Sequence, residues 1–491
     1  MHSVNLQQQH SFSGHDSLHD ATFIRHDGDR VLMSSDLSDV LESPPAINEH
    51  ALSHYLQSSL CPPPMTVYGD VYILNIGDRL DFDPAHPAAP PKFTCEYPYF
   101  QNSGTGGSIP STTTLLDCLT RSFDNRVKGT AALMLSAGKD SSAVLACVQN
   151  AGRQGDITAY TVESPDPAQG GAGEAAIAAK LCAKVGVKHH ALSMPDAKTT
   201  RAALNRFFTH SPHPNCDPTL IPYVACLYAE GIRDTDIIDG TRSDAYTGML
   251  PTRKQAVMAS YYRMLGGGFP LQNLRGCYPF TGGADKFFST YMQYRFYKHA
   301  HFRHAETARF YDGSIDTHPF WWAAFQSRSH LCDDDMLTLI AARYFDSGSV
   351  VPKARLCAKT LDCRLVLPWA DRDLARYYHN LPHTDKFDDR AGQAKLLIRK
   401  MLREVLDYDD LKIGKRAFYF NRLQFVAGNL PFIREEILSC RWWNKQAKAA
   451  FEIYAQNPKA AGALIDWFLL SGWLNHCKYL KGRKGRGGNG R

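Results

Sequence analysis

The chain has 491 residues, 44% of them apolar and 21% charged, a composition that excludes disordered and fibrous proteins and suits two or three globular domains. It contains no run of the ~18 apolar residues that a membrane-spanning helix needs, and its N-terminus shows no secretory signal, so we expect a cytoplasmic protein without a membrane span. The net charge of +6 comes mostly from the Gly-rich residues 481–491, which carry five basic residues and no acidic one, so the remainder is close to neutral.

Residues 1–95 predict a small α+β unit. Two short strands flank the Asp27-Gly28 turn, a helical periodicity follows at residues 47–60, and strand patterns return at residues 65–82. Prolines and a run rich in Gly, Ser and Thr then indicate a linker at residues 96–114.

Beyond the linker, apolar strands alternate with helices. This alternation with short connections predicts an α/β fold, in which a parallel sheet carries helices on both faces. From about residue 250 to 480 the pattern is mainly helical, and residues 481–491 predict a basic, disordered tail. The predicted strands are residues 130–136, 157–162, 188–194 and 234–240, and the predicted helices are residues 141–151, 173–186 and 199–209.

Thirteen cysteines are scattered through the sequence, and no two of them form a Cys-x-x-Cys motif. An odd number of cysteines in a chain of this length is not typical of a disulfide framework. We expect buried thiols in a reducing compartment, and the spacing argues against a structural zinc ribbon or a sulfur-carrying pair.

The most informative motif is SAGKDSS at residues 136–142, between an apolar strand and a helix. Small residues let backbone N–H groups approach a ligand closely, and a helix N-terminus adds partial positive charge, so this junction predicts a cradle for a di- or triphosphate. The spacing matches neither the Walker loop nor G-x-G-x-x-G. A small-residue turn in which Ser141 caps the helix is the alternative.

SAGKDSS resembles the pyrophosphate-binding loop S-G-G-x-D-S-S of the N-type ATP pyrophosphatases, and later segments resemble the synthetase domain of the asparagine synthetases. The ordered set implies a synthetase domain at residues 115–480. The later segments are DGTRSDAYTG (239–248), similar to S-G-x-G-x-D-E-L-F-G; PWADRDL (368–374), similar to P-F-L-D-x-x-L; GQAKLLIRKML (392–402), similar to a K-x-x-L-R helix; and GKRAFYF (414–420), similar to a K-x-x-F loop.

The resemblance implies that ATP adenylates a substrate carboxylate, that pyrophosphate leaves, and that an amine then displaces AMP. Asp140 and Asp244 also follow predicted parallel strands, whose carboxyl ends bind ligands, and oxygen donors suit a hard cation. Taken alone, each aspartate would cap a helix and each lysine would lie on the surface. The resemblance assigns ATP to Leu135, Ser136, Gly138, Asp140, Ser141, Ser142, Val162 and Gly240, Mg²⁺ to Asp140 and Asp244, and catalysis to Lys415, with Lys395 supporting the phosphates.

The N-terminal unit resembles only the last part of the family's glutaminase domain, through NEHALSHYLQ and TVYGDVYILNIGD. Glutaminases of this family use an N-terminal cysteine as nucleophile and its α-amine as base. Position 2 is His2, and the first cysteine is Cys61. We therefore interpret residues 1–95 as a degenerate glutaminase-like remnant that packs on the synthetase domain without contributing chemistry.

Three departures from the family pattern concern the expected site. Ala137 replaces a loop glycine, which requires a negative φ at this position. Ala245 replaces the acid after Asp244, and Thr241-Arg242 replace a Glu-Gly-like pair. Because these residues lie near the expected acceptor pocket, we expect an acceptor other than aspartate.

One histidine-rich segment predicts no site. KHAHFRHAETARF contains His299, His301 and His304, but only the last two have the i,i+3 spacing of a helix face, and no acid is well placed for metal binding. We expect an exposed basic and aromatic helix here.

Together these features favour an ATP-dependent carbon–nitrogen ligase that uses no glutamine and acts on a carboxylate substrate, with a peptide among the candidates. Glutaminase-deficient members of the family include β-lactam synthetases and lasso-peptide macrolactam cyclases, so the resemblance implies natural-product or peptide biosynthesis and a precursor-processing protein as a candidate partner. The alternatives are a tRNA-modifying ATPase and ammonia-dependent amidation. The near-neutral body argues against a nucleic-acid partner.

Overall fold

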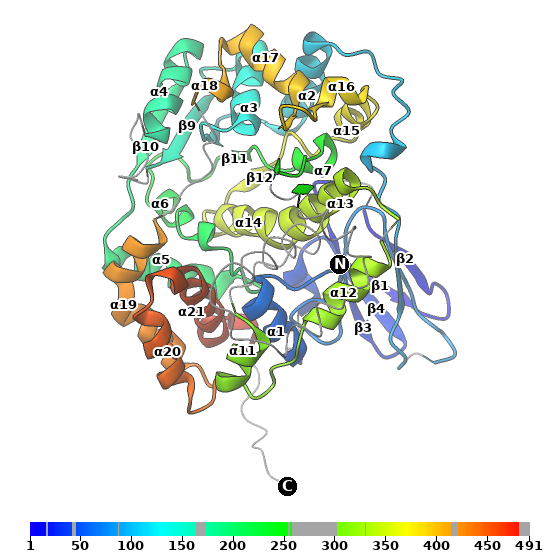
Figure 1. Ribbon diagram of the computed structural model, residues 1–491, viewed down its shortest axis with the longest axis vertical. Coiled ribbons are helices and arrows are strands. Elements are labelled where there is room, and N and C mark those ends of the chain that lie inside the picture. Colours follow the sequence, from blue (N-terminus) through cyan, green and yellow to red (C-terminus); the bar gives the residue numbers. More distant parts are fainter. Residues whose placement is uncertain are drawn as a thin grey trace.

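The computed structural model describes residues 1–15, 18–41, 46–86, 88–163, 173–253, 256–257, 302–328, 330–413 and 421–480. Within these residues a parallel α/β layer lies beside two antiparallel sheets and a group of C-terminal helices (Figure 1). Three predictions fall outside the described residues: Lys415 with its 414–420 loop, the 481–491 tail, and the pair His299 and His301.

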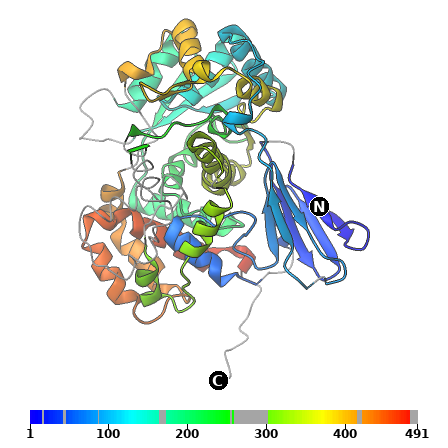
Figure 2. The same ribbon diagram turned by 45° about the vertical axis from the view of Figure 1, so that its right-hand side comes forward.

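The N-terminal residues form two antiparallel sheets on one side of the molecule (Figure 2). The predicted turn is confirmed: it joins β3 (Thr22–Asp27) to β4 (Arg30–Ser34), with Gly28 at a φ of 66°. The sheet orders are β1-β4-β3-β5 and β2-β6-β7. The other strands are β1 (His2–Asn5), β2 (Ser11–Ser13), β5 (Val71–Leu74), β6 (Asp78–Asp81) and β7 (Lys92–Cys95), and the short helices are η1 (Leu37–Leu41) and η2 (Gln101–Ser103).

The central sheet has five parallel strands in the order β10-β9-β8-β11-β12, which confirms the predicted fold class. All four predicted strands are present. The fifth strand, β12 (Arg364–Val366), was not predicted and pairs with β11 at the sheet edge. The predicted strands are β8 (Ala131–Met134), β9 (Ile157–Val162), β10 (Lys188–Leu192) and β11 (Asp236–Asp239).

Helices cover both faces of this sheet, as predicted (Figure 1). On one face α3 packs against α2 and α17, and residues 141–148 of α3 are buried because sheet and helices enclose them. On the other face α14 packs against β12, and α6 against β9. These helices are α2 (Thr112–Arg126), α3 (Lys139–Asn150), α4 (Glu174–Val185), α5 (Ala197–His210), α6 (Tyr223–Cys226), α14 (Val351–Thr360) and α17 (Leu396–Leu406).

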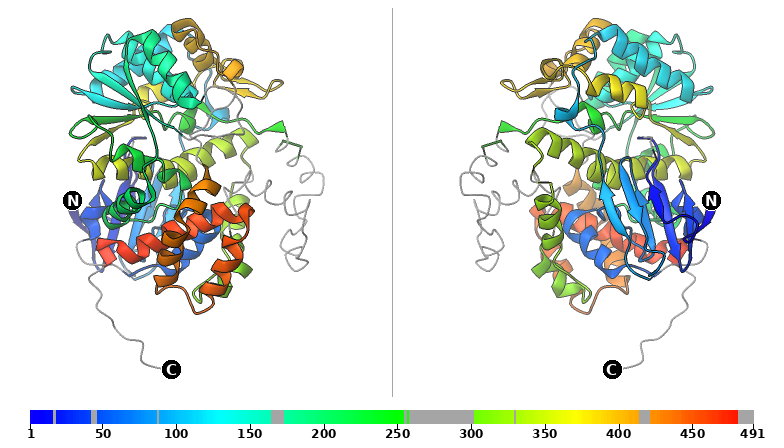
Figure 3. Two further views of the ribbon diagram at one scale, coloured as in Figure 1. Left: turned by 90° about the vertical axis from the view of Figure 1, so that its left-hand side faces the viewer. Right: turned by 90° about the vertical axis from the view of Figure 1, so that its right-hand side faces the viewer.

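The helix α1 (Glu49–Ser58) leaves the N-terminal sheets and packs against the C-terminal helices α21 (Ala461–His476) and α11 (His304–Phe310) (Figure 3). Phe310 stacks on Trp467 with ring centroids 4.1 Å apart. One hydrophobic core therefore contains residues of the N-terminal unit and of the C-terminal helices.

The remaining elements connect these layers. The helix α13 (Asp333–Leu339), the π-helix η5 (Ile340–Val350) and α14 follow one another without a break. The other elements are η3 (Pro218–Leu220), α7 (Asp244–Thr247), α12 (His318–Gln326), α15 (Arg372–His379), α16 (His383–Lys386), β13 (Phe387–Asp388), β14 (Gln393–Ala394), α18 (Asp410–Ile413), α19 (Arg422–Ser439), α20 (Ala447–Ala455), η6 (Pro458–Ala460) and η7 (Lys478–Leu480).

A buried ion pair fixes the N-terminal unit to the π-helix η5. Arg343 of η5 donates to Asp78 of β6, and the two side chains are 2% and 0% exposed. Arg343 also donates to the Pro63 carbonyl at 3.2 Å and lies over the Phe93 ring at 4.8 Å. Because η5 also lines the candidate site described below, this pair connects the N-terminal unit to the site.

Among the described residues, no helix combines the length and the apolar character needed to cross a bilayer.

Replacing Asp78 tests this connection. Asp78→Asn leaves the buried Arg343 guanidinium without its counter-charge, so we expect the free energy of unfolding to fall by about 3–5 kcal/mol. Urea denaturation followed by tryptophan fluorescence measures this change. The control is Asp81→Asn on the same strand, because its ion pair with Arg79 is exposed to solvent, and such pairs contribute about 0–1 kcal/mol. Equal losses in the two variants would contradict the buried-pair argument.

Candidate active site

The candidate site is a cavity at the carboxyl ends of β8 and β11. The chain runs from β8 outward to β10 and then crosses to β11, so the loops after β8 and β11 diverge from a topological switch point, where α/β sheets bind ligands. The cavity wall includes the 135–141 loop, the 239–244 loop, Val162 of β9, and residues of η5 and α14.

The 136–142 loop is held by its own hydroxyl groups. The backbone N–H of Ser136 donates to Ser141 Oγ at 3.1 Å, and the two hydroxyls lie 2.9 Å apart. The Gly138 N–H donates to Ser136 Oγ at 3.1 Å. The φ of Ala137 is not positive, so an alanine can replace the glycine of the family loop without backbone strain. The N–H of Ala137 donates to Glu174 Oε1 at 3.1 Å, so a carboxylate of α4 also holds the loop.

Gly240 allows the two loops to approach each other. A Cβ at this position would lie 2.8 Å from the Ser141 nitrogen and 2.9 Å from its Cα, both of which are backbone atoms that cannot rotate away. A side chain here would therefore push the first turn of α3 away from β11.

Lys395 lies between the two predicted magnesium ligands. Its Nζ is 2.6 Å from Asp140 Oδ1 and 2.6 Å from Asp244 Oδ1, and it donates to Ser243 Oγ at 2.8 Å. Burial acts to raise the pKa of Asp140, but Lys395, together with Ser243 and Lys139, outweighs burial, and the pKa falls below its ordinary value. Burial acts to lower the pKa of Lys395, and the two carboxylates raise it above its ordinary value.

The converging carboxylates fit a divalent cation. Both of them already contact one positive charge through oxygen, which is the donor type that Mg²⁺ prefers. Among the described residues, no cluster of three or more His, Cys, Asp or Glu side chains is arranged to hold a metal. Mg²⁺ is commonly bound by one or two carboxylates, with phosphate oxygens and water as its other ligands. Asp140 and Asp244 therefore fit a Mg²⁺ ion.

The structure brings most of the predicted site residues together. Ser142 is fully buried in α3 and does not line the cavity. Lys395 contacts Asp140 and Asp244 at the cavity edge, and Lys415 lies outside the described residues. The predicted residues that line the cavity are Leu135, Ser136, Gly138, Asp140, Ser141, Val162, Gly240 and Asp244.

Several cavity residues were missed by the sequence analysis. Asp346 of η5 and Lys353 of α14 come from a region interpreted only as helical, and charged residues in a helix of mixed composition give no distinctive signal. Asp239 ends β11 and accepts hydrogen bonds from Tyr223 Oη and from the Thr241 N–H, each at 2.9 Å. Asp239 could have been found from its position at the end of a buried strand.

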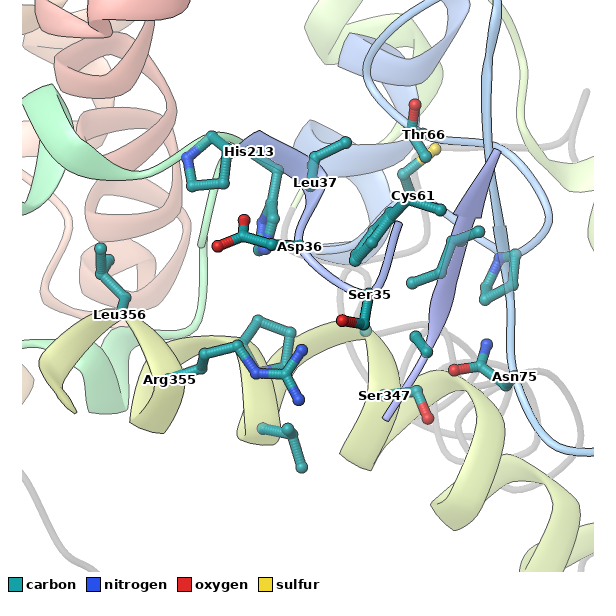
Figure 4. A pocket seen from close by; sticks show the side chains of 18 of the residues that line it. Ser35, Asp36, Leu37, Cys61, Thr66, Asn75, His213, Ser347, Arg355 and Leu356 are labelled. Carbon is teal, nitrogen blue, oxygen red and sulfur yellow. The ribbon is translucent and has the colours of Figure 1, made fainter. Parts of the chain in front are cut away.

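A second cavity, here called the interface cavity, lies between the N-terminal unit and α14 (Figure 4). At the edge of this cavity, Asp36 accepts a hydrogen bond from Lys359 at 2.8 Å. Arg355 projects from α14 toward the cavity. Cys61 is buried in its wall, and burial raises the pKa of the Cys61 thiol. Arg242 lines both this cavity and the candidate site.

A parallel α/β sheet with a small-residue loop and paired acids at its switch point is the architecture of a nucleotide-binding enzyme. The family model for asparagine synthase matches residues 114–439, about two thirds of the chain, and the protein therefore belongs to the asparagine synthase family. Members of this family are ATP-dependent carbon–nitrogen ligases that use ATP and Mg²⁺. A search of the curated proteins found no match.

The buried Asp346 carboxyl predicts a pH-dependent stability. Burial raises its pKa to about 7, Asp244 and Asp140 raise it as well, and Arg242 and Lys395 oppose the shift. In the unfolded chain the same carboxyl ionises near pH 4, so it lowers the free energy of unfolding progressively from about pH 4 to pH 7. Asp346→Asn removes this loss. We therefore expect the Tm difference between the variant and the wild type to grow from pH 5 to pH 7 and to level off above about pH 8.

Thermal unfolding across this pH range provides the measurement. Asp117→Asn, on the exposed face of α2, is the control for replacing an aspartate. A Tm difference for Asp346→Asn that stays constant from pH 5 to pH 8 would contradict the shifted pKa.

Proposed function

We propose that this protein is an AMP-forming amide ligase, which adenylates a substrate carboxylate with ATP and transfers the acyl group to an amine. The observation that carries this proposal is the position of Asp140 and Asp244, which meet at Lys395 beside the 136–142 loop at the N-terminus of α3. Family membership supports the coarser activity of an ATP-dependent carbon–nitrogen ligase.

In the first step the loop holds the β- and γ-phosphates through its backbone N–H groups at the N-terminus of α3. An oxygen of the substrate carboxylate attacks the α-phosphorus, the bond from this phosphorus to the β-phosphate oxygen breaks, and pyrophosphate leaves with the electron pair. Asp140 and Asp244 would hold Mg²⁺, which supplies positive charge to the phosphate oxygens. Lys395 contributes a second cation at the same place.

In the second step an amine attacks the acyl carbon of the adenylate, the carbon–oxygen bond to phosphate breaks, and AMP leaves. Negative charge develops on the acyl oxygen and on the departing phosphate. Lys415, by its resemblance to the family lysine, would stabilise this charge, and Lys395 would support the phosphates.

The thiols of the N-terminal unit favour an amine that does not come from glutamine. Burial raises the pKa of the Cys61 thiol, and burial also raises the pKa of Cys95 to about 11. A thiol of high pKa forms little of the thiolate that attacks an amide. We therefore propose that the amine belongs to the acceptor itself, as in the macrolactam cyclases that the sequence resembles, and that a precursor-processing protein supplies a peptide substrate.

The nucleotide product tests the reaction. The protein is incubated with ATP, Mg²⁺, hydroxylamine and a panel of carboxylates, namely aspartate, glutamate, N-acyl amino acids and peptides with acidic side chains. We expect AMP, pyrophosphate and a hydroxamate in equal amounts with at least one carboxylate. Asp140→Ala and Asp244→Ala each remove an oxygen ligand where charge develops, and should lower the rate by about 10²-fold or more.

The control variant is Asp117→Ala, an exposed aspartate on α2, which should retain the wild-type rate. ADP and inorganic phosphate as the main products would refute the proposed reaction. A wild-type rate in folded Asp140→Ala or Asp244→Ala would remove that aspartate from the site.

Glutamine labelled at its amide nitrogen tests the nitrogen source. In the absence of hydroxylamine we expect no glutamate release and no labelled amide, because no thiol of the N-terminal unit is activated. Labelled ammonium chloride in a parallel reaction tests ammonia-dependent amidation. Glutamate formed in proportion to AMP would show that the N-terminal unit is a working glutaminase.

A further inference from the structure

Arg242 is a buried cation with unused hydrogen-bonding capacity. Its side chain is 5% exposed, and its Nη1 donates to the Ser347 hydroxyl at 2.8 Å and to the Ala342 carbonyl at 3.4 Å. Its Nε has no acceptor, and no carboxylate among the described residues lies within ion-pair distance of it. Asp346 acts on this charge only from beyond ion-pair distance. A buried charge without a direct ion-pair partner is costly, so its retention points to a ligand that supplies one.

Asp346 is a buried anion that also has unused hydrogen-bonding capacity. It lies in η5, is 3% exposed, and its Oδ2 has no hydrogen-bond donor. The π-helix is rare, and where π-type turns interrupt α-helices they are often found at functional sites. Asp346 and Arg242 line the same cavity, but the distance between their charged groups exceeds that of an ion pair. The cavity wall therefore offers one cation and one anion that are not satisfied by each other.

The backbone of Arg242 is also under strain. Its φ is 80°, in the left-handed region that favours glycine. The family pattern quoted above has a glycine at this position. The chain thus keeps the glycine conformation while carrying a guanidinium, which is unfavourable for a residue with a Cβ. Strain of this kind persists where the surrounding structure enforces it and is concentrated at active sites and ligand clamps.

The two charges differ in position from the groups that would bind the phosphates. The N-terminus of α3 and Lys395 lie on the β8 and α17 side of the cavity, whereas Arg242 follows β11 and is anchored to η5. A ligand that satisfies both unpartnered groups presents a carboxylate to Arg242 and an ammonium or amine to Asp346. These are the two groups that an amide ligase joins.

We propose that Arg242 binds the carboxylate to be adenylated, and that Asp346 binds the amine nucleophile and accepts its proton. This assignment rests on the proposed function. An ammonium N–H bond breaks as the proton moves to Asp346 Oδ2, which passes it to water, and the freed nitrogen lone pair forms the bond to the acyl carbon. As the carbon–oxygen bond to phosphate breaks, AMP leaves with the electron pair. The nitrogen then loses its second proton to Asp346, which again passes it to water. The substrate is accordingly a molecule, or a pair of molecules, that presents a free carboxylate and an aliphatic amine together.

Arg242→Gly is the variant for the carboxylate half. This variant removes the guanidinium and relieves the strain of the left-handed backbone at position 242, so we expect it to fold. The substrate is the carboxylate with which the wild-type protein releases AMP. We expect the KM of the variant for this carboxylate to rise about tenfold or more, because one hydrogen bond between charged groups is lost. Binding of α,β-methylene-ATP with Mg²⁺ should change less than twofold. A tenfold loss of nucleotide binding would instead assign Arg242 to a phosphate and overturn the proposal.

Asp346→Asn is the variant for the amine half. With methylamine, which is protonated at neutral pH, amide formation should fall about 10²-fold or more, because no group removes the proton. Hydroxylamine is unprotonated at neutral pH, so hydroxamate formation should stay within a few-fold of the wild-type rate. A thermal unfolding scan establishes that the variant is folded. Equal losses with the two amines would show that Asp346 is not the proton acceptor.

The interface cavity supplies matched controls. Arg355→Ala and Asp36→Asn remove the same two types of charge from its wall (Figure 4), and neither residue lines the candidate site. Both control variants should keep the wild-type KM and the wild-type rates with both amines. If they lose activity as much as Arg242→Gly and Asp346→Asn, the effects are structural and the proposal fails. Absence of AMP from the wild-type protein with every carboxylate would instead refute the proposed function, on which this assignment rests.

Discussion

The Lys395 ammonium, held between Asp140 and Asp244, is the interaction on which the site depends. It joins three segments that are distant in the sequence: the loop after β8, the loop after β11 and the N-terminus of α17. Without a cation, two carboxylates this close would repel each other and one of them would take up a proton. The arrangement keeps both ionised at the place where phosphate chemistry requires positive charge. A single buried lysine therefore assembles the site and prepares its electrostatics.

The N-terminal unit has a structural part in the same site, although its cysteines are poorly suited to catalysis. Arg343 inserts from η5 into this unit and pairs with Asp78, and the same π-helix carries Asp346 three residues later. The carbonyl of Ala342, which precedes Arg343, accepts from Arg242. The orientation of η5 thus depends on contacts in the N-terminal sheets. We infer that the N-terminal unit is retained because it positions η5.

Much of the α/β layer could be predicted from the sequence, because short strand patterns such as the apolar run of β8 alternate with helices of clear periodicity. β12 could not, since it has three residues, begins with Arg364 and gains its apolar environment only by pairing with β11, more than 120 residues earlier. The small-residue loop and both aspartates are local motifs and were found. Ser142 belongs to the same motif but faces the core, which a motif alone does not reveal. Asp346 was missed because its role depends entirely on which loop its helix packs against.

The replacement at Arg242 shows how a pocket changes while its scaffold stays constant. A glycine at this position serves only the turn after β11, since its left-handed φ costs nothing. An arginine with the same φ must be held there by other contacts, and the Ala342 and Ser347 acceptors on η5 supply them. The substitution at 242 and the acid at 346 are therefore coupled through one helix. A chain that acquired the arginine alone would bury a cation without a nearby anion. Asp346, which lines the same cavity, opposes that charge without pairing with it, so both groups stay available to a substrate that carries their complements.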